Sequence, residues 1–242
     1  MKLLLCIPTY NEAENLVTLV ADVLNTVPQA NILVIDDNSP DGTGQIADQL
    51  GQTYPEKVYC LHRPGKSGLG TAYISGFRWA IEHGYDAVGQ MDADFSHPVD
   101  KIPLLIAALE EHPIAIGSRY VPGGSLDERW PFWRKALSAW GNFYARSILG
   151  MKLRDVTGGF RLWRVEVLKH LPLERIRSNG YVFQVEMAYV ANLLGFRATE
   201  LPIHFADRRW GKSKMNFRIQ VEAALRVWQL LGMYRDLRAN KP

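Results

Sequence analysis

Two features that define whole classes of protein are nearly missing from this sequence of 242 residues. It has only two cysteines, Cys6 and Cys60, and both lie in apolar runs typical of strands. That number excludes a disulfide scaffold and a zinc site built from cysteines, and it favours a reducing compartment. Long apolar runs are missing as well, since no stretch reaches the roughly 18 residues of a membrane span.

The beginning of the sequence lacks a secretory signal. The apolar run after Met1 and Lys2 is about six residues long, which is shorter than the roughly 7–15 residues of a signal-peptide core. We therefore expect a cytoplasmic protein. Aromatic residues, in contrast, are plentiful: seven Trp, ten Tyr and nine Phe form too much apolar surface to stay solvated, which excludes a mainly disordered chain.

Charge is distributed unevenly along the chain. Residues 1–100 hold 5 Lys and Arg against 13 Asp and Glu, whereas residues 101–242 hold 23 against 12. An acidic half suits a cation, and a basic half suits phosphate groups or an anionic surface. The sequence has no zinc finger, basic zipper or RNA-binding aromatic signature, so we expect no nucleic-acid partner.

The first 120 residues alternate short apolar runs with longer amphipathic ones. The runs predict strands over 3–8, 32–36, 58–61, 87–91 and 114–117, and helices over 12–26, 41–50, 69–83 and 99–110. Asp41 is the expected N-cap of the second helix. This alternation predicts an α/β fold with a mostly parallel sheet, in which ligands bind at the carboxyl ends of the strands.

Residues 121–242 are less regular. Helices are predicted over 133–149, 182–194 and 216–237, and a strand is predicted over 197–205. The last helix has a wide apolar face, which fits a helix packed on the core or one lying on a membrane. No linker rich in Pro, Gly or Ser divides the chain, so we expect one domain over residues 1–242.

Paired carboxylates follow the fourth predicted strand. Asp92 and Asp94, separated by Ala93, lie where a loop leaves the sheet. Two carboxylates at such a place suit Mg²⁺ or Mn²⁺ together with phosphate oxygens. A solvated turn explains the same motif, and position at a strand end makes the two interpretations about equal. Asp37, after the second strand, is similarly a candidate ligand for a nucleotide.

Glycines and cations form further candidate sites. Residues 63–70 resemble a phosphate loop without matching a Walker or dinucleotide motif, and a plain turn explains them as well. Basic side chains lie beside tryptophans at Arg134 near Trp130, and at Arg208 and Lys214 around Trp210. Such pairs indicate a surface that meets phosphate and lipid together, although an aromatic core with solvated charges fits equally.

Taken together, the motifs resemble those of the polyprenol-phosphate (dolichol-phosphate) mannosyltransferases, which are inverting glycosyltransferases. The matching strings occur in the family's order over nearly the whole chain. They are Ile7-Pro8-Thr9-Tyr10-Asn11-Glu12, Asp36-Asp37-Asn38-Ser39-Pro40-Asp41-Gly42, Gly65-Lys66-x-Gly68-Leu69-Gly70, Asp92-Ala93-Asp94-Phe95-Ser96-His97-Pro98, Gly117-Ser118-Arg119-Tyr120, Asp155-x-Thr157-Gly158-Gly159-Phe160-Arg161 and Arg208-x-x-Gly211-x-Ser213-Lys214.

The resemblance implies a fold of the GT-A type and a role for each matching residue. Residues 1–120 would bind nucleotide and metal, and residues 121–242 would bind the acceptor and end in an amphipathic helix. The implied nucleotide-sugar contacts are Pro8, Tyr10, Glu12, Ile35, Asp37, Asp92, Ala93, Asp94, Arg119, Arg208 and Lys214. The implied metal ligands are Asp92 and Asp94, the catalytic residues Asp94, Arg119, Arg208 and Lys214, and the acceptor-phosphate contacts Arg134 and Ser138.

One position departs from some relatives, because Ser96 stands where they have a glutamine that ligates the metal. The implied reaction transfers mannose from GDP-mannose to a polyprenyl phosphate with inversion. We expect peripheral contact with the cytosolic face of a membrane, directly or through a small anchoring subunit. Two alternatives remain open: another sugar nucleotide such as UDP-glucose as donor, and a non-catalytic subunit that only binds a nucleotide sugar.

Overall fold

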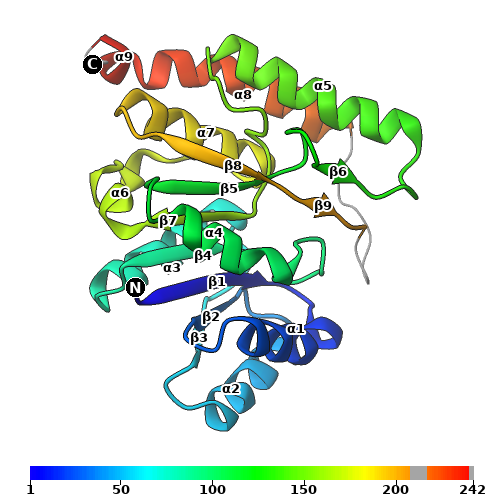
Figure 1. The fold of residues 1–242 in the computed structure, drawn as a ribbon, viewed down its shortest axis with the longest axis vertical. Helices are drawn as coiled ribbons and strands as arrows, with labels where there is room; N and C mark the ends of the chain where they lie inside the picture. The colour runs from blue at the N-terminus through cyan, green and yellow to red at the C-terminus, as the bar shows by residue number, and fades with distance from the viewer. Residues whose placement is uncertain (208–216, 240–242) are drawn as a thin grey trace.

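The computed structural model of the protein describes residues 1–207 and 217–239. Its main sheet has seven strands in the order β3-β2-β1-β4-β7-β5-β8 (Figure 1). All neighbouring strands run parallel except at β7, which is antiparallel to both β4 and β5. The expected α/β fold with a mostly parallel sheet is therefore confirmed. The strands are β1 (Leu3–Thr9), β2 (Asn31–Asp36), β3 (Val58–His62), β4 (Ala87–Gln90), β5 (Ile114–Ser118), β7 (Arg161–Arg164) and β8 (Ala198–Pro202).

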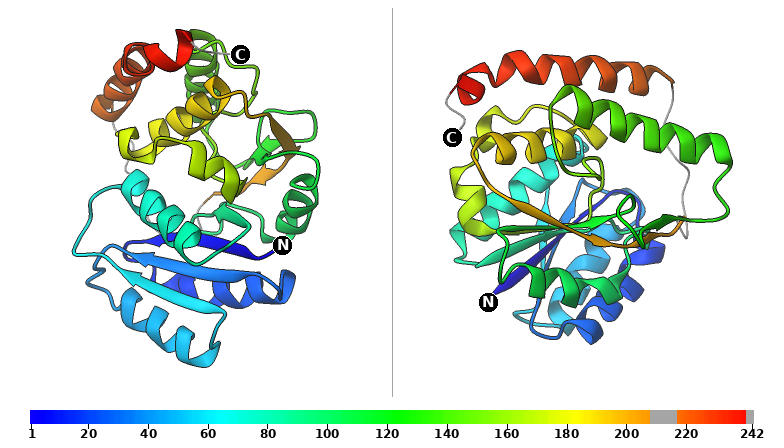
Figure 2. Two further views of the ribbon diagram at one scale, coloured as in Figure 1. Left: turned by 90° about the vertical axis from the view of Figure 1, so that its left-hand side faces the viewer. Right: turned by 45° about the horizontal axis from the view of Figure 1, so that its top comes forward.

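Helices cover both faces of this sheet and create two apolar cores (Figures 1 and 2). One core holds the side chains of α1 (Ala13–Thr26), α2 (Thr43–Thr53) and α4 (Ile102–Ala108). The other holds those of α3 (Leu69–Glu82), α6 (Val165–His170) and α7 (Gly180–Leu193). Because both faces are covered, β1 and β2 are buried along nearly their whole length, as their continuous apolar sequences require.

Two long helices form an outer layer at one end of the molecule. Figures 1 and 2 show α5 (Phe132–Ile148) and α8 (Phe217–Met233) side by side, and a short α9 (Arg235–Ala239) follows α8. The Tyr144 hydroxyl donates to the Ala224 carbonyl over 3.2 Å and accepts from Trp228 Nε1 over 2.9 Å. Within residues 1–207 and 217–239, no helix combines the length and apolarity needed to span a membrane.

Several boundaries differ from the sequence prediction. The helix predicted over 99–110 opens with a 3₁₀ turn, η1 (Val99–Lys101), before α4, and a second turn, η2 (Leu173–Arg175), precedes α7. The strand predicted over 197–205 divides at Ile203 into β8 and β9 (His204–Phe205), and β9 pairs with β6 (Ser125–Leu126) in a separate small sheet. Strand β7 was not predicted at all.

Asp41 acts at the start of two helices rather than one. Its Oδ1 accepts the backbone N–H of Thr43, the first residue of α2, over 3.0 Å. Its Oδ2 accepts the N–H of Ala13, the first residue of α1, over 3.1 Å. The predicted N-cap was therefore wrong by one residue: the cap is Gly42, whose φ of 90° only glycine adopts readily, and Asp41 accepts the first N–H of α2 from the position before it.

Candidate active site

The carboxyl ends of β1, β2 and β3 lie next to one another at a single edge of the sheet. Thr9 and Asp36 are partners in the parallel register, and the Asp37 N–H donates to the Thr9 carbonyl over 3.1 Å. The Arg63 N–H donates to the Asp36 carbonyl over 2.8 Å. The segments that follow these strands therefore share the edge at which ligands bind in parallel α/β sheets.

Asp92 and Asp94 leave the same edge after β4, and neighbouring groups hold both. Asp94 is buried, and its Oδ1 accepts the N–H of Ser96 over 3.1 Å and the Ser96 hydroxyl over 2.6 Å. The Tyr73 hydroxyl, from α3, donates to Asp92 Oδ1 over 3.3 Å. Directly after Asp94, Phe95 has a φ of 61°, a left-handed conformation that costs a bulky residue about 1–3 kcal/mol.

A buried histidine that sequence reasoning left unassigned supports this loop. His97 Nδ1 accepts the backbone N–H of Asp92 over 3.0 Å, and its ring stacks on Phe160 at 5.0 Å. Burial lowers the pKa of His97 even though the charges of Asp92 and Asp94 act in the opposite direction. A neutral ring that accepts at Nδ1 fixes the Asp92 backbone without adding positive charge to the carboxylate pair.

Asp37, after β2, forms an ion pair at the same edge. Arg63 Nη1 donates to Asp37 Oδ1 over 2.6 Å, and Arg63 Nη2 donates to Thr71 Oγ1 over 2.7 Å. Burial raises the pKa of Asp37, and the charge of Arg63 only partly offsets it. Arg63 was predicted only as part of the candidate phosphate loop over 63–70 and not as the partner of Asp37, although its place directly after a strand was a signal that could have identified it.

The other predicted nucleotide contacts divide between the open edge and the core. At the edge, Lys66 Nζ lies 4.0 Å from the centre of the Tyr10 ring, a cation–π arrangement. Glu12 accepts from Asn15 Nδ2 over 2.8 Å, and Pro8 is partly exposed. Ile35 and Ala93, in contrast, are buried among core side chains. Contacts from these two would therefore involve the backbone.

Arg119 follows β5 and is fixed by a buried carboxylate. Its Nε and Nη2 each donate to an oxygen of Asp155 over 2.7 Å, and Nη2 also donates to Thr157 Oγ1 over 2.7 Å. Burial opposes ionisation of Asp155, but the charge and hydrogen bonds of Arg119 outweigh it and lower the pKa of Asp155. Asp155 holds the predicted phosphate-binding arginine in one orientation, and because it lies 36 residues away the sequence did not identify it as the partner.

The predicted acceptor residues lie on α5. The Arg134 guanidinium stacks on Trp130 at 3.6 Å from the ring centre and donates to Asp207 Oδ1 over 3.3 Å. The hydroxyls of Ser138 and Tyr120 are 2.7 Å apart, which ties α5 to the segment after β5. Because Arg119 and Tyr120 are consecutive, the structure brings the Ser138 side of α5 close to the Arg119–Asp155 pair.

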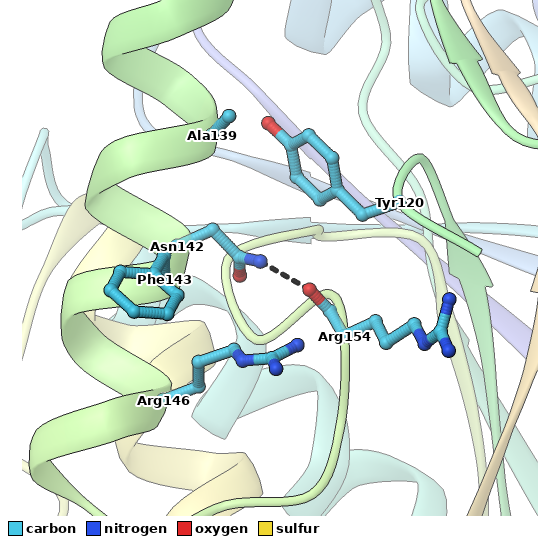
Figure 3. A pocket seen from close by; sticks show the side chains of 6 residues that line it. All are labelled: Tyr120, Ala139, Asn142, Phe143, Arg146 and Arg154. Atoms are coloured by element: carbon cyan, nitrogen blue, oxygen red, sulfur yellow. Dashed lines mark hydrogen bonds between the residues drawn. The ribbon is translucent and has the colours of Figure 1, made fainter.

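A pocket of about 320 Å³ adjoins the contact between Ser138 and Tyr120. It lies between α5 and the loop that follows α5 (Figure 3). Asn142, on the wall formed by α5, donates to the Arg154 carbonyl and accepts the Val156 N–H over 2.8 Å, so the loop is fixed in place. The pocket thus combines cations with aromatic and small apolar groups beside the predicted acceptor site. Its lining residues are Tyr120, Ala139, Asn142, Phe143, Arg146 and Arg154.

Two predicted catalytic residues, Arg208 and Lys214, lie outside the residues that the structure describes. Within the described ranges, the strand edge thus brings together Tyr10, Asp37, Asp92, Asp94 and Arg119. The oxygen donors of Asp92 and Asp94 are of the type that Mg²⁺ and Mn²⁺ prefer. Their fixed backbone and the Ser96 contact hold a donor set that fits such an ion.

Comparison with known proteins identifies the family. Residues 4–172 match the model described as glycosyl transferase family 2. The chain belongs to this family. It is 45% identical over 242 residues to an undecaprenyl-phosphate mannosyltransferase from Micrococcus luteus, covering 99% of both chains. It is 44% identical to a polyprenol monophosphomannose synthase from Mycolicibacterium smegmatis, covering 95% of this chain and 87% of the relative.

Solved structures show that this glycosyltransferase has the expected GT-A fold. Glucosyl-3-phosphoglycerate synthase from Mycobacterium tuberculosis in complex with UDP superposes with a TM-score of 0.66 over 96% of this chain and 79% of that chain, at 16% identity. The same enzyme has also been solved with Mn²⁺ and UDP-glucose, again with a TM-score of 0.66. The carboxyl edge of this family 2 glycosyltransferase is therefore its candidate active site.

Proposed function

We propose that this glycosyltransferase transfers mannose from GDP-mannose to a polyprenyl phosphate with inversion, giving a polyprenyl β-mannosyl phosphate and GDP. The observation that carries the proposal is near full-length similarity to two relatives named for this chemistry. The carboxylate pair and the cations at the sheet edge support it, because the reaction joins a diphosphate donor to a phosphate acceptor. A subunit that only bound the donor would not require the fixed orientation that Asp155 and Thr157 give to Arg119.

On the donor side, Asp37, Tyr10 and Glu12 are proposed to hold the guanosine part of the nucleotide. Pro8 would contact it with its partly exposed ring, and the buried Ile35 would contact it through the backbone. Asp37 is already oriented by Arg63, whose charge it balances. The Lys66 ammonium over the Tyr10 ring belongs to the loop three residues before α3, where it would meet phosphate oxygens.

Asp92 and Asp94 would hold Mg²⁺ or Mn²⁺, with Ala93 contributing the backbone between them. When bound, the ion supplies a positive charge that stabilises the diphosphate as it leaves. The hydroxyl of Ser96 donates to Asp94 Oδ1. We therefore assign Ser96 the task of orienting the carboxylate, in place of the glutamine that some relatives use as a ligand.

On the acceptor side, Arg134 and Ser138 are proposed to bind the lipid phosphate, and Arg119, Arg208 and Lys214 to neutralise the phosphates of both substrates. Charge-assisted hydrogen bonds from guanidinium to phosphate are strong and directional. The acceptor is already an anion, so attack on the anomeric carbon requires no general base. A phosphate oxygen attacks opposite the leaving diphosphate, the bond to GDP breaks, and the configuration changes from α to β.

The outer layer is proposed to contact the cytosolic face of a membrane. On α5, Phe132 is 85% exposed, Trp133 66% and Phe143 61%, and on α8 Leu225 is 60% exposed. Aromatic side chains beside cations such as Arg134 are typical of membrane-interface surfaces. This surface would place the lipid phosphate near Ser138, with a small membrane-anchoring subunit as a further candidate partner.

The donor assignment can be tested by competition. GDP and UDP are titrated against the protein with Mn²⁺, and the change in tryptophan fluorescence or the heat of binding is recorded. We expect GDP to bind at least about tenfold more tightly, because a base-specific site loses polar contacts with the wrong base. Tighter binding of UDP would favour the alternative, transfer from UDP-glucose to the same lipid phosphate.

A further inference from the structure

A second group of metal-ligating side chains shares no residue with the carboxylate pair of the candidate active site. Asp48 is on α2, and Cys60 and His62 are on β3, the strand at one end of the main sheet. One ligand atom from each of these three residues lies within 4.8 Å of the other two. Since positions 60 and 62 are two apart on a strand, their side chains point to the same face, the one that α2 covers.

The local packing orients this group. His62 Nε2 lies 2.9 Å from Asp48 Oδ1, so the carboxylate already points at the imidazole. Gly44, one turn before Asp48 on α2, leaves the space for the ring, because a Cβ there would lie 3.2 Å from His62 Cε1. Asp48 and His62 are about half exposed, with 51% and 54% of their side chains accessible, and an ion could therefore enter from solvent.

We propose that Asp48, Cys60 and His62 form a binding site for a zinc-type divalent cation. A carboxylate, an imidazole and a thiolate are all zinc ligands, and three protein ligands leave a fourth position for water. Tetrahedral bonds of about 2.0–2.3 Å put ligand atoms roughly 3.3–3.8 Å apart, so small side-chain rotations complete the site. Mg²⁺, which prefers oxygen ligands, would be rejected here and accepted by Asp92 and Asp94.

Binding would be coupled to proton release. Burial, together with the charges of Asp48 and Asp36, raises the pKa of the Cys60 thiol to about 12. As the metal–sulfur bond forms, the S–H bond breaks and the proton passes to solvent. The bound ion would join α2 to β3 one residue before Arg63, and it would stabilise the folded chain by an amount that rises with the logarithm of its concentration once that concentration exceeds the dissociation constant.

The test uses Co²⁺ as a spectroscopic probe on the full-length reduced protein, followed by Zn²⁺ titration calorimetry. We expect a thiolate-to-cobalt charge-transfer band in the parent that is abolished in Cys60→Ser. In His62→Gln, Zn²⁺ affinity should fall at least about tenfold, the scale seen even for residues that merely orient metal ligands. Cys6 is fully buried in the core and cannot supply the band.

His170→Gln is the matched control. His170 is exposed and faces a carboxylate, Glu166 Oε1 at 3.6 Å, and neither cysteine of the chain belongs to that pair. The His170→Gln variant should have the same charge-transfer band and the same Zn²⁺ affinity as the parent. A parent without a charge-transfer band, or a band that survives in Cys60→Ser, overturns the proposal. Melting temperatures recorded without metal identify any variant that has lost its fold.

Discussion

The charged side chains on the two sides of the candidate active site are held by different kinds of partner. On the nucleotide side, carboxylates are held by short-range donors: Asp94 by Ser96 two residues away, and Asp36 by Ser39 three residues away. On the acceptor side, Arg119 is held by Asp155, 36 residues away, and Arg134 by the Trp130 ring and Asp207. Asp94 and Asp36 are thus held within their own loops, and Asp37 and Asp92 take partners 26 and 19 residues away. Both arginines of the second side depend on carboxylates that the fold must bring close from 36 and 73 residues away.

This contrast fits the two substrates. Rigid, locally fixed carboxylates suit a soluble nucleotide and a small hard cation. Cations supported by aromatic rings and distant carboxylates suit a phosphate that arrives on a lipid, next to a surface that exposes Phe132, Trp133 and Leu225. Variants in the two regions should therefore lose different properties. Variants on the nucleotide side should lose reaction with the donor, and variants on the acceptor side should lose folding stability or binding of the lipid.

The largest expected effect is on stability. Asp155→Ala leaves the Arg119 guanidinium buried without its partner, and removing one member of a buried ion pair costs about 3–5 kcal/mol. Urea unfolding of the parent and the variant measures the difference. Asp207→Ala, which removes a partly exposed partner of Arg134, is the comparison and should cost less than about 1 kcal/mol. Equal losses in the two variants would contradict the contrast.

The same pair predicts how stability depends on pH. Asp155 has a lower pKa in the folded protein than in the unfolded chain, where its carboxyl keeps its ordinary value near 3.8. The pair therefore contributes its full stability above pH 4, and the contribution is lost as the pH falls below that value. In Asp155→Asn, urea midpoints between pH 7 and pH 3 should fall less steeply than in the parent. Parallel slopes would show that Arg119 does not hold Asp155 ionised.

The next largest effect is on catalysis. Asp94→Ala should reduce mannose transfer at least about a hundredfold, the usual loss when a charge-stabilising contact is removed, and leave the fold intact. Asp100→Ala, in the same segment and with a side chain that is 72% exposed, is the control and should stay near the parental rate. Steady-state rates with Mg²⁺ or Mn²⁺ decide this, and activity of Asp94→Ala within threefold of the parent would exclude the metal assignment.

A smaller loss is expected on the acceptor side. Arg134→Ala should raise the KM for polyprenyl phosphate about tenfold while the KM for the donor changes little, because it removes one charge-assisted contact. Arg208→Ala and Lys214→Ala should impair transfer more than they lower the melting temperature. If all three variants matched the parent at subsaturating lipid, the phosphate-binding role of these cations would be wrong.

The smallest effect concerns the membrane. Leu225→Ser together with Trp133→Ser removes two exposed apolar groups from α8 and α5, and binding to anionic vesicles should weaken several-fold. Val17→Ser, on the exposed part of α1, is the matched control. Transfer to a short-chain, water-soluble acceptor should be unchanged in both. If the double variant and Val17→Ser sediment equally with the vesicles, the membrane contact lies elsewhere on the protein.

Sequence patterns predicted the first half of the fold well because its strands are buried on both faces and its helices are amphipathic. They missed β7, since Arg161 and Arg164 at its ends do not resemble a central strand. Arg161 is nonetheless fully buried, because its guanidinium donates to the carbonyls of Gly158, Gln184 and Val156. These partners lie 3, 5 and 23 residues away, and a network so irregular in sequence leaves no periodic signal.

The C-terminal helix illustrates the same limit. Its apolar face was wide enough for either a core or a membrane location. In the structure, one part of the apolar face of α8 is buried and the other part is exposed. Val227 and Leu230 are buried against the core, while Leu225 and Trp228 are more than half exposed. The sequence identified the amphipathic helix but could not show which part of the face the neighbouring α7 and α5 cover.

The most direct test of the central claim is a product assay. The purified protein is incubated with Mn²⁺ and a polyprenyl phosphate, once with GDP-mannose and once with UDP-glucose, and the lipid product is analysed by mass spectrometry and NMR. We predict a polyprenyl mannosyl phosphate with a β linkage from GDP-mannose and little product from UDP-glucose. Preferential transfer of glucose, or an α-linked mannosyl phosphate, would contradict the account.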